Sequence, residues 1–101
     1  MGSNMAITIQ TNFFPPLDKA KMYFVYILYD KYVSWEFCMR TLMDHFHKSR
    51  EDAEVITNEI LTNGEGLCGV FMFEIAESKA KLIEEQAKKE GFSLRCLIEE
   101  V

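Results

Sequence analysis

Eight consecutive residues, Met22 to Tyr29 (MYFVYILY), are aromatic, β-branched or aliphatic, so both faces of this run are apolar. Such side chains favour strands over helices. A strand that is apolar on both faces is typical of one that is covered on both sides or lies at the centre of a sheet. The run therefore predicts a strand over residues 22–29 and a sheet around which the rest of the chain must pack.

Two helical patterns follow this strand. Ser34 is a predicted N-cap, and apolar side chains then recur at helical spacing at Trp35, Cys38, Leu42 and Phe46. Ser49 predicts a second N-cap, with an acid three residues later at Asp52. Its helix carries Ala53, Ile56 and Ile60 on one face and ends at Asn63-Gly64.

The second half of the chain repeats the strand and helix signals. Residues 66–73 read as a strand, and Gly69 inside it indicates that something approaches the backbone closely. Residues 74–90 predict a helix with acids in its first turn, lysines in its last and Gly91 as the C′ residue. Residues 92–99 alternate in the period of a strand with one better-buried face.

The predicted order is therefore β-α-α-β-α-β. We expect an α+β fold, a two-layer sandwich in which a three-stranded antiparallel sheet carries its helices on one face. The domain is expected over residues 22–101. Residues 1–21, which contain Phe13-Phe14-Pro15-Pro16, are expected to form a flexible N-terminal arm, and their first five residues, MGSNM, resemble a vector remnant.

Composition excludes several classes of protein. The net charge is −5 and no block of five or six basic residues occurs, so nucleic-acid binding is not expected. No apolar segment reaches the ~18 residues of a membrane span, and no signal peptide is visible at the N-terminus. The three cysteines, Cys38, Cys68 and Cys96, form no CxxC pair, which predicts buried free thiols in a reducing compartment such as the cytoplasm. A monomer is the default expectation.

The residues provide no catalytic, metal or cofactor motif. His45 and His47 are two apart on a predicted helix, so they point in directions ~200° apart and cannot chelate one metal ion. Gly64-Glu65-Gly66 precedes a strand rather than a helix N-terminus, which favours a turn over a phosphate cradle. A small domain without a catalytic grouping is typical of a binding or adaptor module.

Several strings of this sequence resemble the ClpS adaptors of the bacterial Clp protease. The most specific are GLCGVF at residues 66–71 and EIAESKA at residues 74–80, and Tyr29-Asp30-Lys31-Tyr32 and Glu36-Phe37 also match. The resemblance covers residues 22–101. It implies a non-catalytic adaptor that binds a substrate through a large apolar N-terminal residue (an N-degron) and delivers it to an AAA+ unfoldase, ClpA or a relative.

The resemblance also implies roles for particular residues. An N-D-D element and a histidine hold the substrate's α-ammonium in the family, and Asp30 matches one of these acids. Val33 and Trp35 match the mouth of the pocket for the first side chain. Three residues match its apolar lining or wall: Cys38, Ile60 and Leu94. Glu74 and Lys79 match the surface that docks on the unfoldase.

Four positions depart from the family pattern. Tyr29 stands for the asparagine, Lys31 for the second aspartate, Thr57 for a pocket methionine and Leu61 for the ammonium-binding histidine. A hydrogen bond to a charged group contributes ~1.5–3 kcal/mol, so loss of the histidine, alone or with the asparagine, is expected to weaken ammonium binding by about one to four powers of ten.

These departures leave alternatives. One is an adaptor that still recognises N-terminal residues, and another is a modulator that docks on the unfoldase with lost or altered recognition. A third is an interaction domain like the C-terminal domain of the ribosomal stalk protein, which the EIAESKA string disfavours. Asp30 itself either binds an ammonium or only closes a turn before the first helix.

Overall fold

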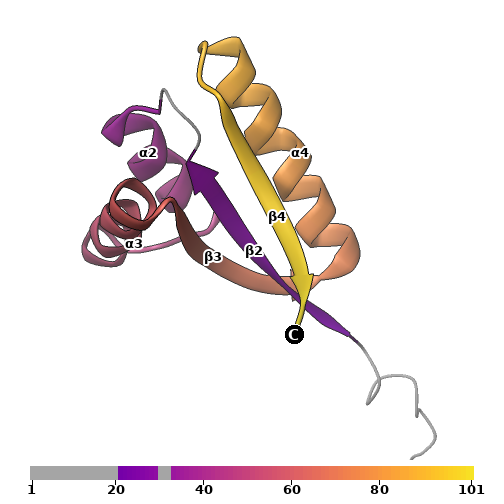
Figure 1. The fold of residues 1–101 in the computed structure, drawn as a ribbon. Coiled ribbons are helices and arrows are strands. Elements are labelled where there is room, and N and C mark those ends of the chain that lie inside the picture. The colour runs from indigo at the N-terminus through magenta and orange to yellow at the C-terminus, as the bar shows by residue number, and fades with distance from the viewer. Residues whose placement is uncertain (1–20, 30–32) are drawn as a thin grey trace, which may run out of the picture.

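The computed structural model describes residues 21–29 and 33–101. Its elements follow the predicted order (Figure 1), and their bounds are β2 (Met22–Tyr29), α2 (Trp35–His45), α3 (Arg50–Asn63), β3 (Glu65–Met72), α4 (Phe73–Lys89) and β4 (Leu94–Glu100). The strands form one antiparallel sheet in the order β3-β2-β4. The predicted α+β class and three-stranded sheet are confirmed.

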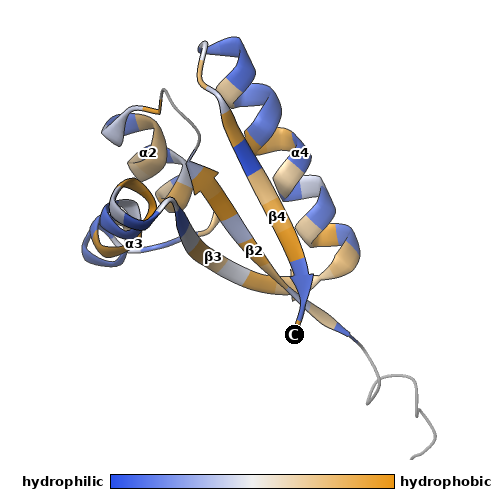
Figure 2. Ribbon diagram, in the orientation of Figure 1, coloured by the Kyte–Doolittle hydropathy of each residue, from blue (hydrophilic) through white to orange (hydrophobic). Residues whose placement is uncertain are grey.

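The apolar run MYFVYILY forms the central strand β2, which is one of the two positions that the sequence predicted for it. Val25 and Ile27 are fully buried on the face that the helices cover. They join a single core with helix residues that include Phe37, Leu42 and Ile83. Figure 2 shows hydrophobic residues along the strands, whereas α4 alternates between hydrophilic and hydrophobic positions.

The β2–β3 ladder is irregular at one point. Val25 lies opposite Gly69, whereas the next residue, Tyr26, lies opposite Leu67, so Cys68 is the extra residue of a bulge. In a regular strand Leu67 and Val70 would face opposite sides, because side chains alternate with a period of two. The bulge places both on one face, opposite Tyr26 and Phe24.

The helix termini were predicted from local signals, and the structure confirms them. The Ser34 hydroxyl accepts a hydrogen bond from the Phe37 N–H at 3.0 Å, and the Ser49 hydroxyl accepts one from the Asp52 N–H at 3.1 Å. Gly64 ends α3 with φ of +89° and donates its N–H to the Ile60 carbonyl at 3.0 Å. Each cap satisfies backbone groups that the helix leaves unpaired.

Several boundaries differ from the prediction by one or two residues. The strand before α4 covers residues 65–72 rather than 66–73, and α4 begins at Phe73. The last strand begins at Leu94, because Phe92 belongs to the helix cap: its N–H donates to the Ala87 carbonyl at 2.8 Å, and Gly91 before it has φ of +82°. Phe46 is the C-cap of α2 instead of a helix residue.

Candidate functional site

Three elements meet where β2 ends. The N–H of Tyr29, the last residue of β2, donates to the carbonyl of Gly64 at the end of α3, at 2.8 Å. Tyr29 also lies opposite Leu94, the first residue of β4. The end of the central strand is thereby fixed against both α3 and β4.

Several of the predicted pocket residues belong to the core cluster or pack against it. Cys38, Ile60 and Leu94 are buried members of the core cluster. Three more predicted residues are half-buried and pack against the same cluster: Tyr29, Val33 and Leu61. Asp30 and Lys31 lie outside the described residues. Tyr29 and Val33, which stand on either side of residues 30–32 in the sequence, both contact the core cluster.

Thr57 is the unusual member of this group. Its side chain is fully buried on α3, and its hydroxyl has no hydrogen-bond partner among the described residues. A buried polar group without a partner costs ~1–3 kcal/mol relative to a satisfied one. Such a group in a native fold calls for an explanation. One explanation is that a bound ligand supplies the missing donor or acceptor.

Thr57→Val is expected to raise the free energy of unfolding by about 1 kcal/mol, because it replaces the unpaired hydroxyl with a methyl group of similar size. Urea unfolding followed by circular dichroism measures the change. A loss of stability of similar size would instead show that the hydroxyl is bonded in the native protein.

Trp35 is separate from the buried cluster. It is 38% exposed as the first residue of α2, so it is not a core aromatic. Its ring lines an open groove of about 440 Å³, together with Glu36, Met39, Arg40, Met43 and Arg50. A position at a pocket mouth remains compatible with this exposure.

The cysteines carry no reactive thiolate. All three are free, and burial raises the pKa of Cys38 to about 11 and that of Cys68 further. Burial, and then the charge of Glu84, raise the pKa of Cys96 to about 12. Because the thiolate is the nucleophile and metal ligand, these neutral thiols are structural. Among residues 21–29 and 33–101, no three His, Cys, Asp or Glu side chains group to hold a metal ion.

The two predicted docking residues on α4 differ in their surroundings. Glu74 is exposed in the first turn of α4. Lys79 is half-buried: its Nζ donates to the carbonyl of His45 at the end of α2, at 2.6 Å, and lies 5.1 Å from the ring centre of Phe71. Five helical residues rotate the direction by ~140°, so Glu74 and Lys79 do not share one face of α4.

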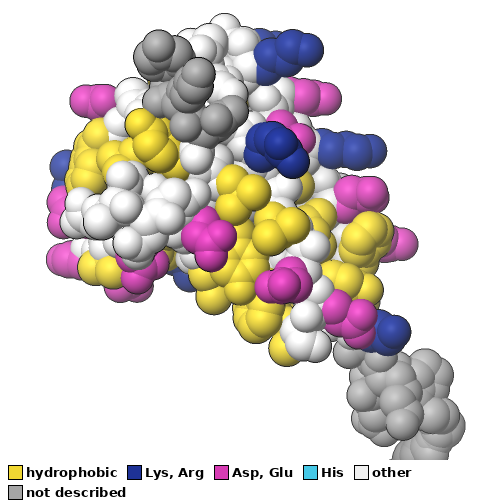
Figure 3. Space-filling view, viewed as in Figure 1, with side chains coloured by type: hydrophobic (Ala, Val, Ile, Leu, Met, Phe, Trp, Pro, Cys, Tyr) yellow, Lys and Arg dark blue, Asp and Glu magenta, His cyan; other side chains and the backbone are white. Residues whose placement is uncertain are grey.

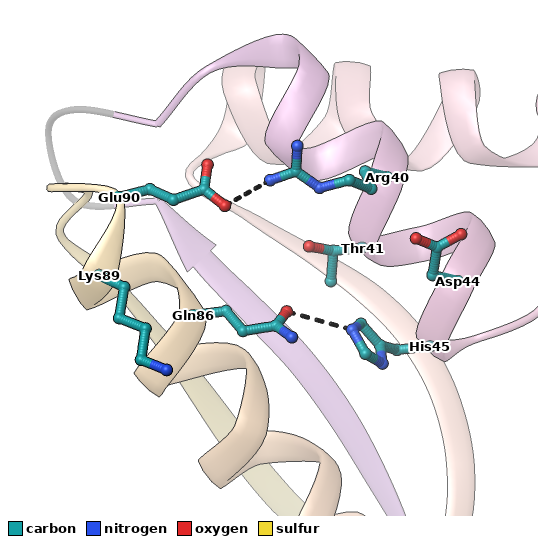
Figure 4. Close-up of a pocket in the computed structure, with 7 residues that line it drawn as sticks. All are labelled: Arg40, Thr41, Asp44, His45, Gln86, Lys89 and Glu90. Carbon is teal, nitrogen blue, oxygen red and sulfur yellow. Dashed lines mark hydrogen bonds and ion pairs between the residues drawn. The ribbon is translucent and has the colours of Figure 1, made fainter.

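A further polar groove, of about 410 Å³, separates α2 from α4 (Figure 4). Two side-chain pairs cross it: Arg40 contacts Glu90 at 2.6 Å, and His45 contacts Gln86 at 3.2 Å. The sequence did not predict these pairs, because their members are 50 and 41 residues apart. They connect α2 to α4 beside the buried cluster.

None of the described helices combines the length and apolar content that crossing a membrane requires.

Comparisons with known proteins agree on one family. The family model of the ATP-dependent Clp protease adaptor protein ClpS matches residues 18–97. A ClpS adapter protein of Helicobacter hepaticus is 38% identical over 85 residues, which cover 84% of this chain and 86% of that protein. One of Caulobacter vibrioides is 36% identical over 98 residues, covering 97% and 90%. The structure of Agrobacterium tumefaciens ClpS2 bound to L-phenylalaninamide aligns with a TM-score of 0.76 and 29% identity, covering 82% of this chain and all of that one.

Proposed function

The chain belongs to the family of Clp protease adaptor proteins ClpS, and from this premise we propose that it binds substrates through a large apolar N-terminal residue and delivers them to a ClpA-like AAA+ unfoldase. The similar ClpS2 structure is the observation that carries the proposal. Phenylalaninamide presents a free α-ammonium group, an aromatic side chain and an amide in place of a first peptide bond. It is thus the chemical equivalent of an N-terminal phenylalanine.

The buried cluster supports a site for the first side chain. Cys38, Ile60 and Leu94 are buried in one apolar cluster, and Leu94 lies opposite Tyr29 at the end of β2. Trp35, the first residue of α2, is exposed and suits the mouth of the pocket. Apolar burial at ~25 cal/mol per Å² makes a large first residue the main source of affinity.

The α-ammonium needs acceptors once it is desolvated, because each of its three donors loses water. Asp30 is the proposed anionic acceptor. Leu61 replaces the family histidine with a side chain that accepts no hydrogen bond. The remaining acceptors are backbone carbonyls and the hydroxyls of Tyr29 and Thr57, the second of which has no partner among the described residues.

Fluorescence anisotropy of a labelled peptide that begins with Phe tests this proposal. We expect N-acetylation of the peptide to lower affinity at least about tenfold, because it removes the charge that Asp30 neutralises. Asp30→Asn is expected to lower affinity for the free peptide by a similar factor and to leave the acetylated peptide unchanged. Equal binding of the two peptides would contradict N-terminal recognition.

The second candidate is a modulator that docks on the unfoldase without recognising N-degrons. The exposed apolar side chains of Phe73 and Ile75, which flank Glu74, favour docking through this end of α4. Glu74→Lys should then abolish unfoldase binding. Glu85→Lys, an exposed acid further along α4, is the matched control. Lys79→Ala is a poorer probe, since it also removes the bond to α2.

The proposal includes no catalytic step. Its support is chemical: the buried, neutral thiols of Cys38 and Cys68 are poor nucleophiles. Three free cysteines also suit a reducing compartment, and we assign the protein to the cytoplasm. Residues 1–20 lie outside the described chain, and the proposal assigns this arm a contact with the unfoldase.

A further inference from the structure

The sheet has a second face that no described helix covers. On β2 the buried residues Val25 and Ile27 alternate with side chains that point away from the core. The open face consists of these side chains and their cross-strand neighbours: Met22, Phe24, Tyr26, Leu28, Leu67, Val70, Met72 and Leu97. Figure 3 shows hydrophobic side chains gathered over the strands, with acidic side chains among them.

The open face is comparable in size with the largest patch of an ordinary monomer. Three strands about 4.8 Å apart and seven residues long cover roughly 14 by 23 Å, or about 320 Å² in projection, including the charged positions Glu65, Arg95 and Glu99. The largest apolar patch on a typical monomer covers about 300–600 Å² and is often functional. The bulge at Cys68 contributes to the open face, since it turns both Leu67 and Val70 to this side.

Charged residues border this face in a particular arrangement. Arg95 on β4 and Glu65 on β3 both lie opposite Leu28, so they flank it at one level of the sheet. Glu99 lies four residues further along β4, opposite Phe24. All three are exposed, and none forms an ion pair within the described chain.

We propose that the open face binds the open face of a second copy of this chain, forming a six-stranded sandwich. Two sheets pack with their strands within about 30° of each other, and a two-fold interface is self-complementary. An axis parallel to β2 lays β4 over β3 of the other copy, which places Arg95 over Glu65. An axis across the strands lays β4 over β4, which places Arg95 over Glu99.

Both arrangements therefore pair each Arg95 with an acid of the other copy, and both bury apolar side chains on apolar side chains. The face is smaller than the ~800 Å² per partner of a standard interface, so we expect self-association to be weak. The buried cluster lies on the other face of the sheet, so dimerisation leaves Ile60 unaffected.

Sedimentation equilibrium of the full chain from 10 µM to 1 mM tests the proposal. Leu97 on the open face and Leu82 on α4 are both 42% exposed, which makes them a matched pair. Leu97→Glu is expected to weaken self-association at least tenfold, and Leu82→Glu is expected to leave it unchanged. A wild-type protein that is monomeric throughout, or equal effects of the two substitutions, would overturn the proposal.

Charge exchange then identifies the partner surface. With the axis parallel to β2, Arg95→Glu and Glu65→Arg each place like charges opposite each other in their own dimers, so each variant should associate about fivefold more weakly than wild type. An equimolar mixture of the two restores both opposite-charge pairs and should form a heterodimer at wild-type strength. If a mixture of Arg95→Glu and Glu99→Arg associates at wild-type strength instead, the two-fold axis runs across the strands. If neither mixture associates more strongly than its components, the face does not bind a second copy.

Discussion

Gly66→Ala is expected to lower the free energy of unfolding by about 3 kcal/mol, although it adds a single methyl group. Gly66 is buried in β3, and a Cβ there would lie 2.6 Å from Cγ1 of Ile60 and 3.2 Å from the backbone oxygen of Ile56. A side chain can shift by changing its rotamer, but a helix carbonyl moves only with its helix. The methyl group therefore pushes α3 away from the sheet.

Thermal unfolding measures this effect, and a loss of ~3 kcal/mol corresponds to a fall in Tm of roughly 12–24 °C for a domain of this size. Gly91→Ala is the matched control. A Cβ at Gly91 meets nothing within 4 Å, so only its φ of +82° opposes the substitution, at a cost of ~1 kcal/mol. Equal losses for the two variants would show that α3 does not approach β3 as closely as described.

Ile60→Ala is expected to cost about 2–5 kcal/mol by itself, since Ile60 is fully buried and its removal leaves a cavity between α3 and the sheet. Ile60 is also one of the predicted residues of the pocket wall, so the same variant should bind a peptide with an N-terminal Phe more weakly. The stability loss is measured by urea unfolding, at concentrations below the onset of self-association.

The two substitutions should not be additive. Ile60→Ala removes the Cγ1 atom that the new methyl group at position 66 would meet at 2.6 Å, and that methyl group partly fills the cavity. We expect the double variant to be about 1–2 kcal/mol more stable than the sum of the single losses predicts. Additive losses in the double-mutant cycle would mean that Ile56, rather than Ile60, resists the methyl group.

The fold was predictable because its signals are local. Ser34 and Ser49 are N-caps that need only the three residues after them, and Gly64 and Gly91 end helices through their own positive φ. Eight residues that are apolar on both faces predicted a strand that is either covered on both sides or central in the sheet, and β2 takes the central position. The last strand begins later than predicted because Phe92 belongs to the cap of α4, where its N–H donates to the Ala87 carbonyl and its ring packs on Phe37 with 5.3 Å between ring centres.

The site could not be derived from local patterns in the same way. Cys38, Ile60 and Leu94 are apolar residues of ordinary appearance, and only the resemblance to ClpS singled them out. Contacts between distant residues, such as Lys79 with the His45 carbonyl, have no signature in the sequence. The crowding at Gly66 was also missed, since the interior glycine that the pattern emphasised was Gly69, whose added Cβ would meet the movable ring of Phe71.

The bond from the Tyr29 amide to the Gly64 carbonyl has a consequence for how the end of β2 moves. This hydrogen bond joins the last residue of the central strand to the C-cap residue of α3. We therefore expect the amide hydrogens of the strand end, the helix end and the core to exchange as one cooperative unit. A pocket wall that unfolds only when the whole domain unfolds is already rigid before a ligand binds. The entropy lost on binding would then come mainly from the ligand, and the protein would contribute complementarity without reorganising.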